Sequence, residues 1–264
     1  MRTLFIIWFT MHNIMAIAPT FFERGLQAVE RPLWLESLTG LDWAMLHIAP
    51  VYFGLGAPKG DGSAVVVVPG FMGADFYLVE LYLWLKRIGY TPYMSGIGWN
   101  ADCLNTLTQK LDKTVAQAYA DTGRQVHLIG HSLGGILSRS VAITRPEKVA
   151  SLITLGTPFR GVRSHPWVLR TAENIRRRIF AAPGATRPDE CFTGFCECPA
   201  VNALQNELSP AIRQAAIYTK FDGVVDWQSC INNNADDFEV TGTHVGLAFN
   251  HQVYSHIAKR LARA

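Results

Sequence analysis

A serine stands at the centre of the pentapeptide Gly130-His131-Ser132-Leu133-Gly134. A short apolar run, 126–129, precedes the pentapeptide, and a helix-like apolar pattern, 136–142, follows it. A strand that turns directly into a helix holds its corner residue in a strained conformation, while glycines on either side let the flanking backbones approach. The pattern therefore predicts that Ser132 is a nucleophile. The alternative is a serine in a glycine-rich turn of another α/β fold.

A nucleophilic serine needs a general base, and His244 is the candidate. It lies on a loop, 241–246, late in the chain. This position suits the order serine, acid, histidine. His251 and His256 fall within an amphipathic terminal helix, where a surface or structural role is the more common one. His131, next to the serine, is expected to pack or to make a supporting hydrogen bond.

The base in turn needs a carboxylate that orients it, and Asp222 is the first choice. It follows an expected strand, 215–219. A carboxylate there can accept the second ring N–H of the histidine and stabilise the imidazolium. Asp226 is the reserve acid, and Asp236 and Asp237 stay open as further candidates, because an aspartate after a strand is also common in plain turns.

A second loop is expected to help bind a negatively charged oxygen in the transition state. Four consecutive valines, 65–68, predict a strand buried on both faces, and Pro69-Gly70-Phe71 follows at its end. In serine hydrolases whose nucleophile lies in a strand-to-helix turn, one backbone N–H comes from a loop in this position and one from the residue after the nucleophile. The expected donors are therefore Phe71 and Leu133; the alternative for the loop is a simple strand-to-helix turn.

Composition narrows the classes of partner. The net charge of the 264-residue chain is +3, too small and too scattered for nucleic acid, and an uncharged substrate would suit it. The spacing of the cysteines lacks paired C-x-x-C knuckles, which argues against a zinc site and leaves disulfides and free thiols open. These cysteines are Cys103, Cys191, Cys196, Cys198 and Cys230.

The elements around these residues alternate between strand and helix. This alternation predicts an α/β fold with a mostly parallel, doubly wound sheet and helices on both faces. The expected strands are 64–68, 90–94, 126–129, 149–155, 215–219 and 238–240, and the expected helices are 77–88, 104–121, 136–142 and 247–261.

Residues 162–208 interrupt this alternation. They contain three consecutive arginines, 176–178, a patch of proline and glycine, and three of the cysteines. We expect a cap or lid insertion over the strand ends, because long insertions there commonly form substrate pockets. The arginines are more typical of a solvated helix face than of an anion site.

The first sixty residues are expected to form an apolar helical segment that packs on a hydrolase domain of residues 61–264. Apolar residues recur every three to four positions over 21–51, which predicts helices broken at Pro32 and Gly40. The apolar run at the N-terminus favours a retained helix that packs on the fold or contacts a membrane peripherally over a cleaved signal. A cytoplasmic or peripherally membrane-associated protein is thus favoured over a secreted one.

With these residues in place, the sequence resembles the bacterial lipase and esterase branch of the α/β-hydrolase superfamily from about Val65 to the C-terminus. The family commonly has His-Gly where Pro69-Gly70 stands here. The resemblance implies the triad Ser132, Asp222 and His244. The motifs that carry it are Pro69-Gly70-Phe71, Gly130-His131-Ser132-Leu133-Gly134-Gly135, Leu155-Gly156-Thr157-Pro158-Phe159-Arg160-Gly161, Asp222-Gly223-Val224-Val225 and Thr243-His244-Val245-Gly246.

The expected chemistry is hydrolysis of carboxylic esters with hydrophobic acyl groups, of the esterase or lipase type. It proceeds through an acyl-enzyme and needs no metal or organic cofactor. An acyltransferase or thioesterase with the same triad stays open, since the pocket selects the acceptor. A haloperoxidase or C–C bond hydrolase and a non-catalytic binding protein are further alternatives.

Overall fold

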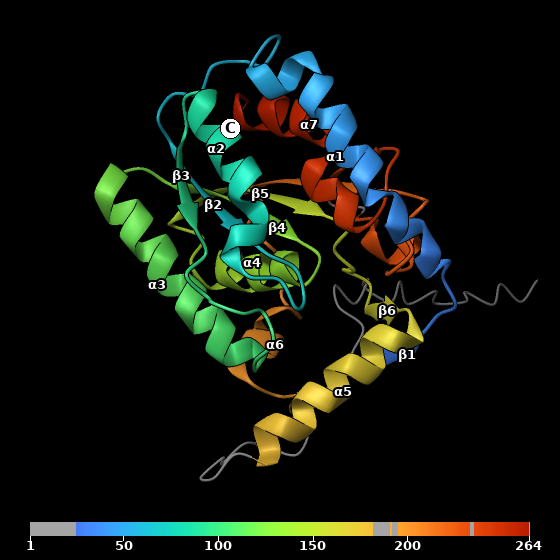
Figure 1. Cartoon of the computed structure of the whole chain (residues 1–264). Coiled ribbons are helices and arrows are strands. Elements are labelled where there is room, and N and C mark those ends of the chain that lie inside the picture. The colour runs from blue at the N-terminus through green and yellow to red at the C-terminus, as the bar shows by residue number, and fades with distance from the viewer. Residues whose placement is uncertain (1–24, 182–190, 192–194, 233–234, 264) are drawn as a thin grey trace, which may run out of the picture.

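A parallel sheet forms the centre of the computed structural model, which describes residues 25–181, 191, 195–232 and 235–263 (Figure 1). Within these residues six strands lie side by side in the order β3-β2-β4-β5-β7-β8, and each pairs in parallel with its neighbour. The strands are β2 (Ala64–Val68), β3 (Thr91–Met94), β4 (Val126–His131), β5 (Val149–Leu155), β7 (Arg213–Tyr218) and β8 (Asp236–Glu239).

Helices cover both faces of this sheet (Figure 1). One face carries α1 (Thr39–Ile48), α2 (Val79–Arg87) and α7 (His251–Leu261), and the other carries α3 (Leu104–Thr122) and α4 (Leu133–Thr144). Alternate valines of β2 serve the two cores: Val65 and Val67 pack toward α2 and α7, whereas Val66 and Val68 pack toward α3 and α4. The sheet is thus buried on both faces, as the valine run predicts.

Two predicted helices differ at their beginnings. The helix expected over 77–88 begins as the 3₁₀ turn η3 (Asp75–Leu78), which continues into α2. The helix expected over 247–261 is divided into the 3₁₀ turn η5 (Val245–Phe249) and α7. Asn250 separates the two, because its side-chain oxygen accepts hydrogen bonds from the N–H groups of Gln252 and Val253 and caps α7.

The segment before β2 holds a strand where helix is expected. It contains β1 (Leu26–Ala28) and the 3₁₀ turns η1 (Leu33–Leu38) and η2 (Pro50–Phe53), on either side of α1. The strand forms because it pairs in parallel with β6 (Val162–Ser164), a partner far along the chain that local periodicity does not reveal. Gly40 lies in the first turn of α1 and does not break the helix.

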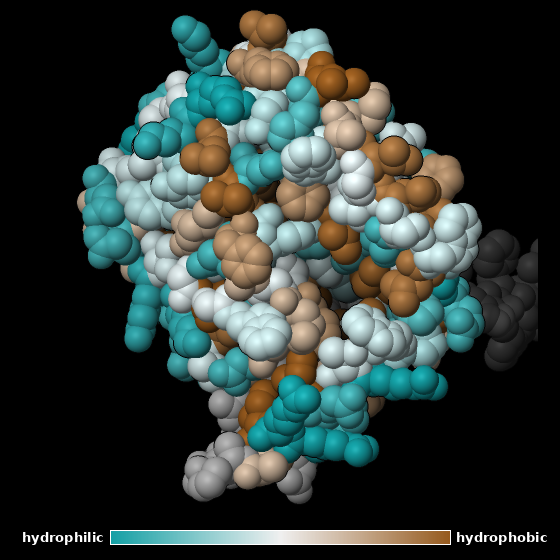
Figure 2. All heavy atoms as spheres, in the orientation of Figure 1, coloured by the Kyte–Doolittle hydropathy of each residue, from teal (hydrophilic) through white to brown (hydrophobic). Residues whose placement is uncertain are grey.

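Much of α1 faces solvent. Leu46 is its one buried side chain, and it belongs to the same hydrophobic core as the buried residues of α2 and α7. Apolar side chains gather on the exposed side of the helix (Figure 2), among them Leu41, Met45 and Ile48. Residues 1–24, which include the apolar N-terminal run, lie outside the described residues, so the peripheral membrane contact stays a prediction. In the described part of the chain, no helix has the length and apolar character needed to span a membrane.

The 162–208 insertion lies beyond the sheet. It contains β6, the helix α5 (Pro166–Ala181) and the short helix α6 (Pro199–Ala203). In Figure 1, α5 extends below the sheet beside the β1–β6 pair. A further 3₁₀ turn, η4 (Trp227–Cys230), follows the loop after β7. The role of the insertion as a lid stays a prediction.

Candidate active site

Ser132 occupies the sharp turn between β4 and α4. Its φ of 51° and ψ of −122° lie in a region that L-residues rarely adopt. The neighbouring glycines are required by close approach: a Cβ on Gly130 would lie 2.5 Å from the Cα of Gly135, and one on Gly134 would lie 2.4 Å from the carbonyl oxygen of Val68. The strand therefore passes into the helix only through small residues, as the pentapeptide predicts.

Hydrogen bonds hold the strained turn from both sides. The N–H of Ser132 donates to the carbonyl oxygen of Leu155 at 2.7 Å, and the Thr157 hydroxyl donates to the carbonyl oxygen of Ser132 at 3.0 Å. Both partners lie at the end of β5. The surrounding structure thus fixes the backbone of Ser132 in the strained conformation.

His244 and Asp222 form a buried pair. The distance from Nδ1 of His244 to Oδ2 of Asp222 is 2.6 Å, and the side chains are 4% and 1% exposed. The other oxygen of Asp222 accepts hydrogen bonds from the N–H groups of Val224 and Val225. A carboxylate can only accept here, so the Nδ1 atom carries the proton and the Nε2 atom is left unprotonated and able to accept one.

The charge around His244 favours its protonated form. Burial lowers the pKa of the imidazole, but the Asp222 carboxylate and, more weakly, the Glu36 carboxylate together raise this pKa above its ordinary value. The site therefore stabilises the imidazolium that a general base becomes after it accepts a proton.

The alternative acids lie elsewhere. Asp226 caps η4, where its carboxylate accepts from the N–H of Gln228, and it pairs with Arg163 at 3.3 Å. Asp236 forms an ion pair with Arg260. Asp237 accepts a hydrogen bond from the main chain of Asn232. Within the described residues, Asp222 is the one of the four candidate aspartates that contacts His244.

Two acidic residues of the N-terminal segment (residues 25–53) support the histidine loop, and neither was predicted from the sequence. Glu36 accepts hydrogen bonds from the main-chain N–H groups of His244 and Val245. Asp42 accepts from the N–H and the hydroxyl of Thr243. No motif marks these two residues, because their function depends on contacts about two hundred positions away along the chain.

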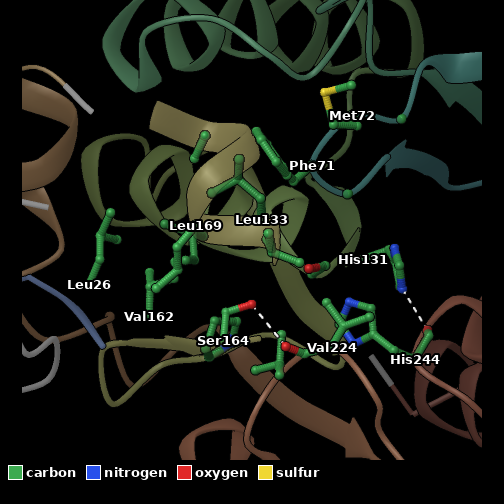
Figure 3. A pocket seen from close by; sticks show the side chains of 18 of the residues that line it. Leu26, Phe71, Met72, His131, Leu133, Val162, Ser164, Leu169, Val224 and His244 are labelled. Atoms are coloured by element: carbon green, nitrogen blue, oxygen red, sulfur yellow. Dashed lines mark hydrogen bonds between the residues drawn. The ribbon is translucent and has the colours of Figure 1, made fainter. Parts of the chain in front are cut away.

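His131 supports the same loop from the sheet. Its Nε2 atom donates to the carbonyl oxygen of His244 at 2.9 Å, as the dashed line in Figure 3 shows. Burial, and then the neighbouring His244, lower the pKa of His131 to about 3, so this imidazole stays neutral. It acts as a neutral hydrogen-bond donor and not as a second base.

The loop after β2 lies against the serine. A Cβ on Gly70 would be 2.7 Å from Nδ1 of His131 and 3.1 Å from Cβ of Ser132, so glycine is needed here for close approach. The unusual φ in this loop, 63°, belongs to Met72. Its N–H donates to the carbonyl oxygen of Asn100, whose side chain donates to that of Pro69. Asn100 thus fixes the loop.

The expected oxyanion donors lie near this contact. Phe71 and Leu133 line the same cavity as Ser132 (Figure 3). Leu133 is the first residue of α4, where backbone N–H groups have no partner within the helix. Within the described residues, neither of the two backbone N–H groups donates to a protein acceptor. Both are therefore free to bind a substrate oxygen.

A cavity of about 510 Å³ opens at the serine. Ser132 and His244 both line it, and in Figure 3 Phe71 and Leu133 lie across it from Val224. Helix α5 contributes part of the wall. The apolar lining residues include Leu26, Leu33, Phe71, Met72, Leu104, Leu133, Ile136, Val162, Trp167, Val168, Leu169, Ala172, Val201, Val224, Val225 and Val245.

The cysteines form no metal centre in the described part of the chain, where no three histidine, cysteine, aspartate or glutamate side chains are grouped to hold an ion. Cys103, Cys196, Cys198 and Cys230 are free thiols. Burial raises the pKa of Cys198 to about 11 and that of Cys230 well above its ordinary value, so these thiols are poorly reactive near neutral pH.

Known proteins resemble part of this chain in sequence. A family model described as palmitoyl protein thioesterase matches residues 65–222. A triacylglycerol lipase from Pseudarthrobacter phenanthrenivorans is 38% identical over 106 residues, which cover 37% of this chain and 33% of the lipase. A triacylglycerol lipase from Burkholderia plantarii is 38% identical over 106 residues, covering 37% of this chain and 30% of that protein. The matches thus span about a third of the length of these curated relatives.

Similarity in three dimensions extends further than similarity in sequence. The crystal structure of a Bacillus licheniformis lipase in its mature form superimposes with a TM-score of 0.54 and 16% identity, over 78% of this chain and 94% of that one. At this level of identity the match shows the fold. The parallel sheet and its helices thus have the α/β-hydrolase fold.

Proposed function

Because the chain belongs to the palmitoyl protein thioesterase family of the α/β-hydrolase superfamily, we propose that it is a serine hydrolase that cleaves carboxylic esters with hydrophobic acyl groups. One arrangement carries the proposal. The strained Ser132 and His244 border a single apolar cavity, and Asp222 lies behind His244 in a buried hydrogen-bonded pair.

In the proposed mechanism, Nε2 of His244 takes the proton of the Ser132 hydroxyl while Oγ attacks the ester carbonyl carbon. The carbonyl oxygen becomes an anion, which the N–H groups of Phe71 and Leu133 stabilise. The C–O bond to the alcohol then breaks, and the imidazolium returns its proton to the leaving alkoxide. Asp222 keeps the imidazole in the required tautomer throughout.

The second half of the reaction releases the acid. Water enters, and the same imidazole removes a proton from it as the water oxygen attacks the acyl-enzyme. A second tetrahedral anion forms in the same oxyanion site and collapses, with the proton passing to Oγ of Ser132. The acid leaves and the enzyme returns to its starting state. Apart from the substrate and this water, the steps use groups that the chain itself supplies.

The cavity favours a hydrophobic acyl group. Its volume lies in the usual range for ligand pockets, and its wall is mostly aliphatic and aromatic. Burial of an acyl chain there gains roughly 0.8 kcal/mol per methylene. The names of the lipase relatives are consistent with a lipid ester as substrate.

A thioester is the second candidate substrate, because the matching family model describes thioesterases. The same serine, base and oxyanion donors would serve both reactions, since only the leaving group differs. The acyltransferase alternative has no such support, and an acceptor other than water is not needed to explain the site.

The test of the proposed function compares turnover of p-nitrophenyl butyrate, p-nitrophenyl palmitate and a palmitoyl thioester by the wild-type protein and by Ser132→Ala. We expect hydrolysis of at least one long-chain substrate and a loss of about 10⁴-fold or more in the variant. The thioester-to-ester ratio assigns the preferred leaving group. Equal turnover by the two proteins would contradict the nucleophile assignment.

The assignment of the cavity has its own test. Ala172 of α5 lines the cavity, whereas Asn174 of the same helix is exposed. We expect Ala172→Trp to fill part of the cavity and to lower kcat/KM for the palmitate ester about tenfold or more, with a smaller effect on the butyrate ester. Asn174→Trp is the matched control. Equal losses for both chain lengths would place the acyl group elsewhere.

A further inference from the structure

Glu36 contacts both loops that carry the proposed acid and base, although it lies in η1, far from them in sequence. Its Oε1 atom accepts hydrogen bonds from the N–H of Gly223 at 2.9 Å and from the N–H of His244 at 3.0 Å. Its Oε2 atom accepts from the N–H of Val245 at 2.9 Å. One carboxylate therefore bridges the loop that follows β7 and the loop that follows β8.

The donors around Glu36 require a carboxylate. Three N–H groups point at its two oxygens, and an ionised carboxylate accepts at both, whereas a glutamine would present an NH₂ group to one of the donors. The contact with Gly223 is also close, since a Cβ there would lie 3.0 Å from Oε1 of Glu36. Neither loop can shift without breaking a charge-assisted hydrogen bond to Glu36.

Other residues of the same segment reinforce this bridge. Arg31 donates from Nε to the carbonyl oxygen of Asp222 at 3.0 Å and from Nη2 to that of Lys220 at 3.2 Å. Asp42 accepts from the N–H of Thr243 at 3.0 Å. The N-terminal segment thus binds the loop that carries Asp222 and the loop that carries His244. Of Arg31, Glu36 and Asp42, Glu36 is the residue that contacts both loops.

We propose that Glu36 is a positioning residue of this hydrolase, which holds the Asp222 and His244 loops at a fixed separation and places a second negative charge near the imidazole. The proposal rests on the proposed function. The ionisable groups that face His244 are Asp222 beyond β7, Glu36 on η1, His131 on β4 and Tyr77 on η3, whose hydroxyl donates to the carbonyl oxygen of Val245. Of these, Asp222 and Glu36 are the carboxylates, and both favour the protonated form of His244.

The test uses two variants with opposite effects on charge. Glu36→Gln removes the charge, and we expect kcat to fall on the order of 10- to 100-fold with a smaller change in KM. The acid limb of the kcat/KM profile should also move to lower pH, because a neutral residue 36 no longer raises the pKa of His244. Glu36→Asp keeps the charge but withdraws it by one methylene, so kcat should fall while the limb stays near its wild-type position.

Two control variants separate this role from a loss of folding. Glu30→Gln alters an exposed carboxylate of the same segment and should match the wild type. Asp42→Asn weakens the support of the histidine loop at Thr243 without removing Glu36, so it should lower the thermal midpoint and leave the acid limb in place. A displaced limb in Asp42→Asn, or an unmoved limb in a folded Glu36→Gln, would overturn the electrostatic part of the proposal. If Glu36→Gln does not fold, an unchanged kcat in Glu36→Asp would overturn the positioning part.

An NMR titration of the His244 ring makes the test independent of turnover. The ring signal is assigned by its absence in His244→Asn, and the pKa of His244 should be lower in Glu36→Gln than in the wild type. If the wild-type protein hydrolyses no ester or thioester, the proposed function fails, but this titration still decides whether the Glu36 charge acts on the imidazole. An unchanged pKa would refute it.

Discussion

The central sheet and the N-terminal segment, residues 25–53, serve one site in different ways. The sheet presents the proposed reacting groups, with Ser132 at the end of β4 and His244 on the loop after β8. The segment supplies no reacting group. Its carboxylates, Glu36 and Asp42, bind main-chain N–H groups of the histidine loop.

The two regions differ in how strictly local geometry limits which residue types they can contain. At the serine turn a Cβ on Gly134 would collide with the backbone of β2, so the motif is fixed by contacts within a few ångströms. The N-terminal segment forms one edge of the site through hydrogen bonds to distant loops. Many local sequences could supply a carboxylate for such hydrogen bonds. Chemistry is therefore recognisable in the sheet, while its support is recognisable only in three dimensions.

The largest effect on kcat in this comparison should come from Asp222, which follows β7 of the sheet. We expect Asp222→Asn to lower kcat about 10³- to 10⁴-fold, because an amide no longer enforces the required tautomer of His244. Asp226→Asn should leave kcat within a few-fold and lower stability by at most about 1 kcal/mol, because an asparagine still caps η4 but no longer forms the ion pair with Arg163. Steady-state kinetics and urea unfolding of both variants measure this contrast. The reverse ranking of kcat would make Asp226 the acid.

A glycine in each region gives the next contrast. Gly70→Ala would push a methyl group into His131 and Ser132, so we expect kcat/KM to fall about 10- to 100-fold. Gly40→Ala lies in α1, where an added Cβ meets nothing within 4 Å, and it should stabilise the protein by up to about 1 kcal/mol. Kinetics and thermal unfolding of the two variants decide the point. Wild-type activity in Gly70→Ala would show that the loop tolerates the shift.

Much of the sheet side of this comparison could be predicted from the sequence. The valine run, the helical periods and the glycines after each helix specify β2, α2 and α3 through local rules, and the serine turn follows from its own glycines. The strand β1 could not be predicted, since three exposed residues form it only by pairing with β6. The start of α7 depended on the Asn250 cap within an otherwise helical apolar pattern.

The candidate site divides in the same way. Chain order and strand ends were sufficient to propose Ser132, Asp222 and His244. The contribution of Glu36 was not predictable, because a single glutamate among the apolar residues of η1 has the same local pattern as any solvated side chain. Its role emerges only when the fold brings three N–H donors around it.

The smallest effect concerns stability against pH. Burial lowers the pKa of His127 to about 4 and that of His131 to about 3, both below the unfolded value near 6.5. These histidines therefore contribute stability above pH 6.5 that is lost as the pH falls toward 3 to 4, by on the order of 2 kcal/mol each between pH 7 and pH 5. His244, with its raised pKa, acts in the opposite sense.

Urea unfolding at pH 7 and pH 5 checks this prediction with one variant. His127→Gln removes one of the two buried neutral imidazoles, so its loss of unfolding free energy between the two pH values should be smaller than that of the wild type. An equal pH dependence in wild type and His127→Gln would show that His127 is protonated in the folded state.

The central claim is that the sheet presents one activated serine to an acyl group held in the apolar cavity. Its most direct test is intact-mass and peptide-mapping mass spectrometry after brief reaction with a long-chain fluorophosphonate. The account predicts a single adduct on the peptide that contains Ser132, much slower labelling in Asp222→Asn, and no labelling in Ser132→Ala. An adduct on another residue, or equal labelling of the wild type and Ser132→Ala, would contradict it.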